Sequence, residues 1–178
     1  MRILAPELDA GTRVLVLEPS CASVFRDELR NLFPNDARAM RLRSQTFLLS
    51  ELLESEGVSY QPPRLAKRAL LHGHCHQKAL MKMGHAESLL RKVGVRVEAP
   101  DSGCCGMAGA FGFEADKFEI SQAIGERVLL PAVRKASDET LIVADGFSCR
   151  EQIEQATGRR PLHLAEVLKL ANASQNSE

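Results

Sequence analysis

The sequence contains no tryptophan, one tyrosine and seven phenylalanines, so aromatic side chains that could stack on unpaired bases are scarce. Lysine and arginine total 23, and aspartate and glutamate also total 23, so no net charge attracts a polyanion. Both shortages argue against nucleic-acid binding, which depends on basic surfaces and stacking platforms. We therefore expect no nucleic acid among the partners.

Long apolar runs are also lacking. No stretch of about 20 apolar residues could cross a bilayer, and residues 1–11, interrupted by Pro6 and Glu7, lack the apolar core of a secretory signal. We expect a cytoplasmic protein without a transmembrane segment, in a compartment where thiols stay reduced. The five cysteines are odd in number and include no C-x-x-C pair, which argues against a purely disulfide framework and against a zinc finger.

The sequence does contain short β-rich apolar runs that alternate with amphipathic segments. This alternation predicts an α/β fold whose sheet is mostly parallel and flanked by helices. The proline-containing segment 57–65 is the best candidate boundary. The predicted strands are 12–17, 68–71, 95–99, 141–144 and 161–164. The predicted helices are 22–33, 44–55, 77–93, 114–129, a short one from residue 131, 150–156 and one from residue 165.

A weak internal repeat accompanies this pattern. Residues 15–25 and 142–153 both show a strand, a turn, a Ser-Cys pair and a helix, and an acidic, apolar helix follows each of them. The repeat predicts two related small halves, which we place at residues 1–60 and 61–178.

Three cysteines occupy the same place in this pattern. Cys21, Cys75 and Cys149 each lie between a predicted strand and a predicted helix. The carboxyl ends of parallel strands meet at one edge of a sheet, and helix N-termini favour the thiolate form that binds metals. We expect the three sulfurs to lie within about 10 Å of one another, as a multinuclear thiolate site requires.

Two further cysteines, Cys104 and Cys105, are adjacent in a glycine-rich loop, residues 101–113. Glycines let a backbone approach a bulky cluster, and neighbouring thiolates can both bind it. A single buried cysteine is more often a core residue than a ligand. The set of five together, however, predicts a metal centre.

The histidines near Cys75 leave several interpretations open. His72, His74 and His76 alternate along the chain and would share one face of an extended segment. They could bind zinc with or without Cys75, donate hydrogen bonds to sulfur, or be polar residues at a strand end. We select His74 and His76 as the candidate additional ligands.

Five segments carry a resemblance to a known family: LEPSC at 17–21, GHCHQK at 73–78, SGCCGMAG at 102–109, FGFE at 111–114 and GFSCREQI at 146–153. They resemble the cysteine-rich CCG domain that occurs in heterodisulfide reductase and in glycolate-oxidase-type iron–sulfur subunits. The likeness is greatest to the C-terminal iron–sulfur region of FAD-linked D-lactate and D-2-hydroxyglutarate oxidases. Residues 1–60 would then be the end of a first cysteine-rich repeat, and residues 61–178 the second.

The resemblance implies a [4Fe-4S]-type cluster bound by Cys75, Cys104, Cys105 and Cys149, with Cys21 as a further ligand. Gly146 stands where some members of the family have the first cysteine of a C-x-x-C pair. The implied function is electron transfer within an oxidoreductase for D-lactate, glycolate or D-2-hydroxyglutarate, with no catalytic residue on this chain.

The resemblance also implies partners. FAD would lie on a partner domain or subunit, a ferredoxin-like iron–sulfur domain would be a second partner, and any peripheral membrane association would occur through them. Two alternatives use the same residues: a zinc-binding structural or interaction domain, and a truncated module with a vestigial site. The sequence alone does not decide whether the chain is an enzyme in its own right.

Overall fold

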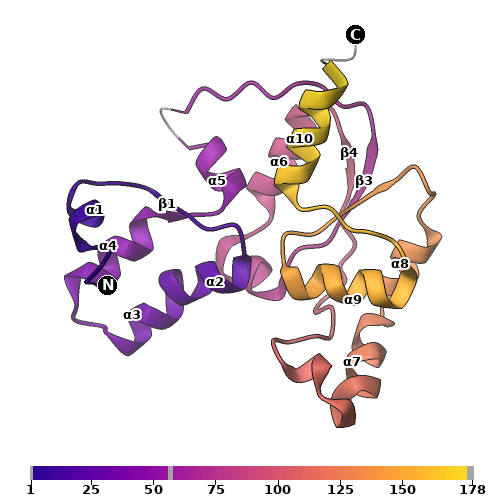
Figure 1. Ribbon diagram of the computed structural model, residues 1–178, viewed down its shortest axis with the longest axis horizontal. Coiled ribbons are helices and arrows are strands. Elements are labelled where there is room, and N and C mark those ends of the chain that lie inside the picture. The colour runs from indigo at the N-terminus through magenta and orange to yellow at the C-terminus, as the bar shows by residue number, and fades with distance from the viewer. Residues whose placement is uncertain (1, 56–57, 176–178) are drawn as a thin grey trace.

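The computed structural model describes residues 2–55 and 58–175 (Figure 1). It confirms the α/β class, and every strand pairing in the described residues is parallel. The strands form two sheets, one of two strands and one of three. Within the described part of the chain, no helix is long and apolar enough to cross a membrane.

The smaller sheet lies in the N-terminal part of the chain, where β1 pairs with β2. A continuous helical stretch follows β1 and begins at Pro19, a residue suited to the first turn of a helix. The elements are α1 (Ala5–Asp9), β1 (Val14–Leu15), α2 (Pro19–Ser23), η1 (Val24–Glu28), α3 (Leu29–Leu32), α4 (Ala37–Gln45), β2 (Thr46–Phe47) and α5 (Leu49–Leu53).

The larger sheet has the strand order β4-β3-β5. An isolated parallel bridge between Val143 and Leu162 extends it beyond β5. Its elements are β3 (Arg68–Leu71), η2 (Gln77–Met81), α6 (Gly84–Lys92), β4 (Arg96–Glu98), η3 (Phe111–Phe113), η4 (Ala115–Lys117), α7 (Phe118–Gly125), α8 (Leu129–Lys135), β5 (Leu141–Val143), α9 (Phe147–Thr157) and α10 (Leu164–Gln175).

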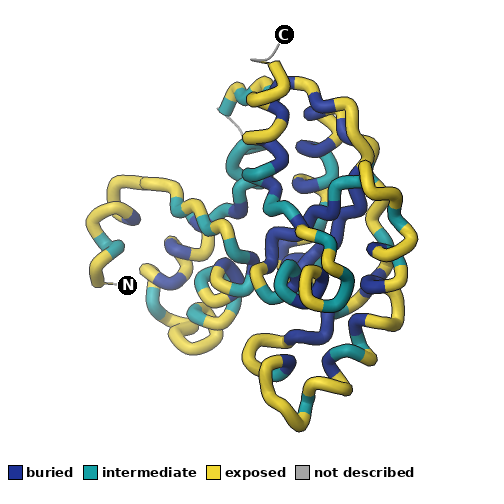
Figure 2. Tube along the Cα trace, turned by 45° about the vertical axis from the view of Figure 1, so that its right-hand side comes forward, coloured by how far each residue is buried: buried dark blue, intermediate teal, exposed yellow. Residues whose placement is uncertain are grey.

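Two hydrophobic layers enclose the larger sheet. Ala69 and Leu71 of β3 pack in one layer with α6 and α10, whereas Leu70 packs in the other with α8 and α9. Figure 2 shows buried residues concentrated along these strands, while the N-terminal elements are mostly exposed. The second layer includes Cys105 and Cys149, so the core itself positions two candidate ligands.

The internal repeat has a structural counterpart. Leu15 pairs with Phe47 in the small sheet, and Val143 pairs with Leu162 in the same parallel manner. The helix after each pairing begins with the same cap, because the carboxylate of its third residue accepts a backbone N–H from the residue before the helix. In α5 the pair is Glu51 and Leu48, at 2.8 Å, and in α10 it is Glu166 and His163, at 2.9 Å.

Hydrogen bonds join the N-terminal elements to the larger unit. Oε2 of Glu18 accepts the N–H of Phe147, the first residue of α9, at 2.6 Å. Nε2 of His163 lies 2.9 Å from the carbonyl oxygen of Leu17. Because Nδ1 of His163 accepts the N–H of Ala165, Nε2 carries the proton of the neutral ring and donates to Leu17.

Glu54, at the end of α5, makes a second polar connection. Its carboxylate contacts three side chains on α6: His85 at 3.1 Å, Ser88 at 2.6 Å and Lys92 at 2.7 Å. Burial of Glu54 opposes its charge, but hydrogen bonds from Lys92, Ser88 and His85 more than offset this and lower its pKa. The carboxylate therefore stabilises the packing of α5 on α6.

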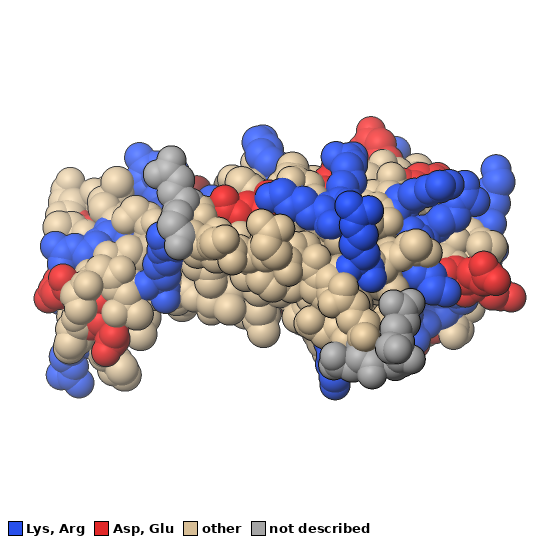
Figure 3. Space-filling model, turned by 90° about the horizontal axis from the view of Figure 1, so that it is seen from above, with Lys and Arg blue, Asp and Glu red and all other residues tan. Residues whose placement is uncertain are grey.

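Charge is spread unevenly over the surface despite its balanced total. On the face seen from above in Figure 3, lysine and arginine side chains predominate over the right-hand half. Aspartate and glutamate appear mainly towards the edges of this view. The neutrality of the whole chain therefore conceals a face that is locally basic.

Candidate metal centre

The larger sheet brings four cysteines together at the carboxyl ends of its strands. Cys75 begins the helical turn that follows β3, and Cys149 is the third residue of α9, after β5. Cys104 and Cys105 lie in the loop that follows β4. The four thiols form one hydrogen-bonded row, in the order Cys75, Cys104, Cys105, Cys149. Three neighbouring strands thus deliver their ligands to one edge, as parallel sheets do.

Protons alternate along this row. The thiols of Cys105 and Cys75 donate to Cys104 and lower its pKa, and Cys105 also lowers the pKa of Cys149. The same hydrogen bonds, together with burial, raise the pKa of Cys75 and Cys105. Two groups that favour the thiolate, Cys104 and Cys149, therefore alternate along the row with two that keep their protons, and a metal that binds all four must displace those two protons.

His72 lies at the buried end of the row. Its side chain is 1% exposed, and one of its ring nitrogens lies within 4.8 Å of the sulfurs of Cys105 and Cys149, which lie equally close to each other. Nδ1 of His72 is 2.8 Å from Oγ of Ser102. Nε2 is buried and has no partner in hydrogen-bond geometry among the described residues, but the ring lies close enough to Cys149 to help lower the pKa of that thiol. Buried nitrogens normally have partners. A buried imidazole nitrogen without a full hydrogen-bond partner, close to two cysteine sulfurs, fits the donor set of a metal centre.

Close packing fixes the loop that carries the adjacent cysteines. Gly106 has φ +104°, and a Cβ there would lie 2.1 Å from the carbonyl oxygen of Ser121. Nε2 of Gln152, a buried residue of α9, donates to the carbonyl oxygen of Cys105 at 3.1 Å. The N–H of Gly106 points at Sγ of Cys104, at 3.4 Å. Glycine is therefore required at position 106 for both backbone conformation and space.

A cavity of about 510 Å³ opens above the outer thiols. Its walls include Cys75, Cys104 and Cys105, together with His74. Phe113 and Phe147, both more than half exposed, also line it. The thiol row thus runs from a solvent-accessible cavity at Cys75 to the core at Cys149. The remaining lining residues are Glu18, Ser20, His76, Ala108, Gly109 and Ser148.

His74 occupies the space beside Gly146. A Cβ at position 146 would lie 2.6 Å from Cδ2 of His74 and 3.1 Å from Sγ of Cys149. A cysteine at this position would therefore collide with the imidazole. Nδ1 of His74 accepts the N–H of His76 at 3.2 Å and lies 3.9 Å from Sγ of Cys75. His74 thus fills the space that a side chain at position 146 would occupy.

Cys21 and His76 stand apart from the row. Cys21 is exposed, and among the described residues no hydrogen bond joins it to the other four thiols. Like Cys149 it is the third residue of its helix, which agrees with the repeat. Its distance from the other sulfurs, expected to be about 10 Å or less, stays a prediction. His76 is exposed, and its Nδ1 lies 3.5 Å from Oγ of Ser23 in α2.

Sequence reasoning selected His74 and His76 as candidate ligands and gave His72 less weight. The structure places His72 close to the sulfurs of Cys105 and Cys149 and Nδ1 of His74 3.9 Å from Sγ of Cys75. Metal binding by His74 or His76 stays a prediction. One signal was available in the sequence. His72 directly follows the fully apolar residues 69–71, which indicates that its side chain is also buried. A buried histidine needs a partner for each ring nitrogen, which points to the metal centre.

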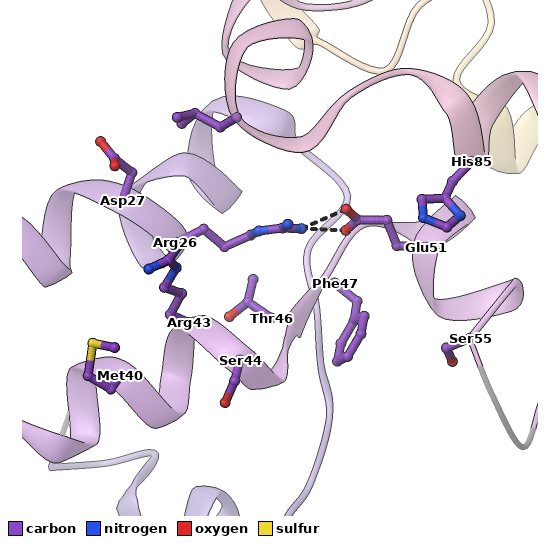
Figure 4. A pocket seen from close by; sticks show the side chains of 11 residues that line it. Arg26, Asp27, Met40, Arg43, Ser44, Thr46, Phe47, Glu51, Ser55 and His85 are labelled. Atoms are coloured by element: carbon purple, nitrogen blue, oxygen red, sulfur yellow. Dashed lines mark hydrogen bonds and ion pairs between the residues drawn. The ribbon is translucent and has the colours of Figure 1, made fainter.

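A second and larger cavity, of about 590 Å³, lies where the N-terminal elements meet η2 and α6. Figure 4 shows Arg26 and Glu51 facing each other inside it, with Nη1 of Arg26 2.7 and 2.6 Å from the two carboxylate oxygens. Asp27, also on its wall, accepts a hydrogen bond from Asn31. No cysteine lines this cavity. Of these two cavities, the candidate metal-binding thiols therefore line the one beside the thiol row.

Comparison with known proteins relates the chain to parts of larger dehydrogenases. It is 29% identical over 167 residues, 92% of its length, to one of the subunits of anaerobic glycerol-3-phosphate dehydrogenase from Escherichia coli, and the match covers 41% of that relative. It is 28% identical over 162 residues, 90% of its length, to D-2-hydroxyglutarate dehydrogenase of Pseudomonas putida, of which the match covers 15%. The dehydrogenase of the same name from Pantoea ananatis is 30% identical over 160 residues, with 89% of this chain and 15% of the relative covered.

The chain therefore spans less than half the length of these relatives. No protein-family model matches it, and no solved structure matches it. What the comparisons establish is that nearly the whole chain is related to a region of two kinds of oxidoreductase.

Proposed function

We propose that this chain is an iron–sulfur electron-transfer module of an FAD-linked oxidoreductase for 2-hydroxy acids of the D-lactate, glycolate or D-2-hydroxyglutarate type. The observation that carries the proposal is the thiol row, since four cysteines meet at one sheet edge, beside an orphaned buried imidazole and an open cavity. Four thiolates are the usual ligand set of a [4Fe-4S] cluster.

The ligands in this proposal are Cys75, Cys104, Cys105 and Cys149. The cluster, when bound, would accept and release single electrons. The chain's own residues hold it in place: Gly106 and Gln152 fix the loop backbone, and the N–H of Gly106 donates to Cys104. His74 closes the side of the site that a C-x-x-C cysteine would occupy.

The relatives suggest where the electrons come from. Their names describe a glycerol-3-phosphate dehydrogenase and a D-2-hydroxyglutarate dehydrogenase, both of which oxidise a secondary alcohol. Such a reaction releases two electrons, which a flavin on a partner domain or subunit could accept together and pass on singly. A ferredoxin-like iron–sulfur domain would be a second partner, and the assembly would operate in the cytoplasm.

The same proposal treats residues 1–60 as the end of a first cysteine-rich repeat and residues 61–178 as a second. The matching strand pairings and helix caps of the two units support this division. Cys21 would occupy in the first repeat the position that Cys149 occupies in the second.

Zinc binding is the alternative that one observation favours. His72, Cys105 and Cys149 lie close enough together to hold a single ion, and two cysteines with one histidine form a known zinc ligand set. A zinc-bound chain would be a structural or interaction domain rather than an electron carrier.

Anaerobic purification of the full chain separates these functions. We expect a brown protein that contains iron and acid-labile sulfide, and Cys104→Ser and Cys105→Ser should each abolish the visible absorbance. Cys21→Ser is the matched control and should retain it. A colourless protein with one zinc per chain would overturn the proposal, and a metal-free wild-type protein after anaerobic reconstitution would indicate a vestigial site.

A further inference from the structure

The hydrogen bonds around His72 carry an inference about how the chain acts on the bound centre. We infer that His72 is a hydrogen-bond donor to the sulfurs of Cys105 and Cys149 and not a metal ligand, and that Lys78 and Ser102 set its tautomer. This inference rests on the proposed function, and it deepens it by assigning His72 a positioning and tuning role at the same centre.

Two hydrogen bonds fix the position of the His72 imidazole ring. The backbone N–H of His72 donates to the carbonyl oxygen of Val143 at 2.8 Å, which continues the ladder between β3 and β5. The ring is held at its other end by Oγ of Ser102, 2.8 Å from Nδ1. Because both ends are anchored and the residue is 1% exposed, the orientation of the ring is fixed, with the sulfurs of Cys105 and Cys149 within 4.8 Å of one of its nitrogens.

The tautomer follows from counting protons. Oγ of Ser102 has two hydrogen-bond partners among the described residues: Nδ1 of His72 and Nζ of Lys78, the latter at 3.3 Å. The lysine ammonium only donates, so it takes a lone pair of the serine oxygen. The hydroxyl proton of Ser102, which is itself buried, then has one available acceptor, Nδ1 of His72. Nε2 must consequently carry the proton of the neutral ring.

The opposite tautomer leaves a buried group without a partner. If Nδ1 of His72 donated to Ser102, the serine proton would point at no acceptor in the described structure, and buried hydroxyl groups normally avoid this. In the Nε2–H tautomer every group is paired once a sulfur accepts from Nε2. A nitrogen that carries a proton cannot bind a metal at the same time.

Further contacts hold the Lys78 side chain in position to donate to Ser102. Its ammonium also donates to the carbonyl oxygen of Gly103 at 3.1 Å, in the same loop as Ser102. Gly73 lies beneath its chain, where a Cβ would come within 3.2 Å of Cε of Lys78. The relay Lys78, Ser102, His72 therefore runs from a partly exposed cation to the most deeply buried sulfurs.

An N–H directed at ligand sulfur has a known consequence. It stabilises the more negative, reduced form of a cluster and so raises the reduction potential. His72 would therefore make the centre a better electron acceptor for the flavin while leaving the number of ligands at four cysteines.

Two variants of the loaded full chain test this. His72→Gln retains an amide N–H but no imidazole, and His72→Leu retains neither. We expect both to keep wild-type iron and sulfide content. The reduction potential should stay near the wild-type value in His72→Gln, and should fall in His72→Leu by at least a tenfold change in the reduction equilibrium, which is about 59 mV for one electron. His85→Gln, on the surface beside Glu54, is the matched control and should change neither quantity.

Loss of iron in both His72 variants would show that His72 is a ligand and would overturn the inference. So would an unchanged potential in a fully loaded His72→Leu protein. A second measurement does not depend on the cluster: long-range ¹⁵N–¹H correlation spectra of the metal-free chain, labelled with ¹⁵N-histidine, report the tautomer of each ring. Protonation of His72 at Nδ1 would contradict the inference even if the wild-type chain proved to bind no iron, a result that would separately refute the proposed function.

Discussion

Gly106 is the position at which a single added methyl group should affect the loop of Cys104 and Cys105 most strongly. Its φ of +104° is costly for any residue with a Cβ, and the new atom would lie 2.1 Å from the carbonyl oxygen of Ser121. Backbone strain of this kind costs about 1–3 kcal/mol, and overpacking adds about 1–3 kcal/mol. We therefore expect Gly106→Ala to lower the free energy of unfolding by about 2–6 kcal/mol.

Gly103→Ala separates the two contributions. Gly103 also has a left-handed backbone, with φ +59°, but a Cβ there would meet no atom within 4 Å. Only the conformational cost applies, about 1–2 kcal/mol. Urea unfolding of both variants, followed by circular dichroism, gives the comparison, and metal content can be measured on the same samples. Equal destabilisation by the two substitutions would refute the reasoning, because it would mean that contact with α7 does not constrain Gly106.

Three further predictions concern the thiols and the junction. The pKa values of Cys75 and Cys105 are raised, so two protons must leave before all four thiols can bind a metal. The affinity of the chain for Co²⁺ should therefore fall by ~100-fold for each unit that the pH falls. Competition titrations at two pH values check this, and a pH-independent affinity would contradict it. Glu54→Gln should cost about 1–3 kcal/mol at neutral pH. Because the pKa of Glu54 is lowered from 4.5, this stabilisation is complete above pH 4.5 and is lost as the pH falls through the folded value, so unfolding curves of variant and wild type should converge there but not at neutral pH. Cys21→Ser should leave the metal affinity of the chain unchanged, because Cys21 is exposed and outside the thiol row, and a measurable loss would make it a ligand.

The larger sheet could be predicted from the sequence because its strands are buried and apolar. The expected strand at 68–71 is β3, and those at 95–99 and 141–144 contain β4 and β5. The prediction for Cys75 and Cys149 followed from their positions at the carboxyl ends of these strands. Gly158 caps the C-terminus of α9 in the left-handed conformation that commonly terminates helices.

Other elements depend on contacts that periodicity does not reveal. The predicted helix 44–55 contains β2, because Thr46 and Phe47 pair with β1 and the helix begins only after Leu48. The predicted helix 77–93 is interrupted where Lys82 adopts φ +68°. The segment 114–129 divides into η4, α7 and the start of α8. The internal repeat could have indicated β2. Phe47 corresponds in the repeat to Leu162, which lies in the predicted strand 161–164.

The site was predictable as a set of cysteines but not in its internal order. Adjacent Cys104 and Cys105 and the strand-end position of Cys75 indicated a common centre. The sequence could not show that Cys21 lies outside the hydrogen-bonded row, because Cys21 and Cys149 are both the third residue of a helix that follows a strand and differ only in the sheet that positions them. Nor could it show that His72, rather than His76, faces the buried sulfurs, since that depends on how β3 pairs with β5.

The strand order β4-β3-β5 has a consequence for biosynthesis. The ligands come from three strand ends, and the last of them, Cys149, follows β5, which is made late in the chain. A ribosome that has produced Cys75, Cys104 and Cys105 has therefore released three thiols that still lack the strand and helix needed to complete their site. Assembly of the proposed cluster would have to wait until β5 and α9 have emerged and docked beside β3, so cofactor insertion would report that the sheet has folded. Until then the nascent chain would carry free thiols, and the proposal therefore predicts that the chain matures under reducing conditions.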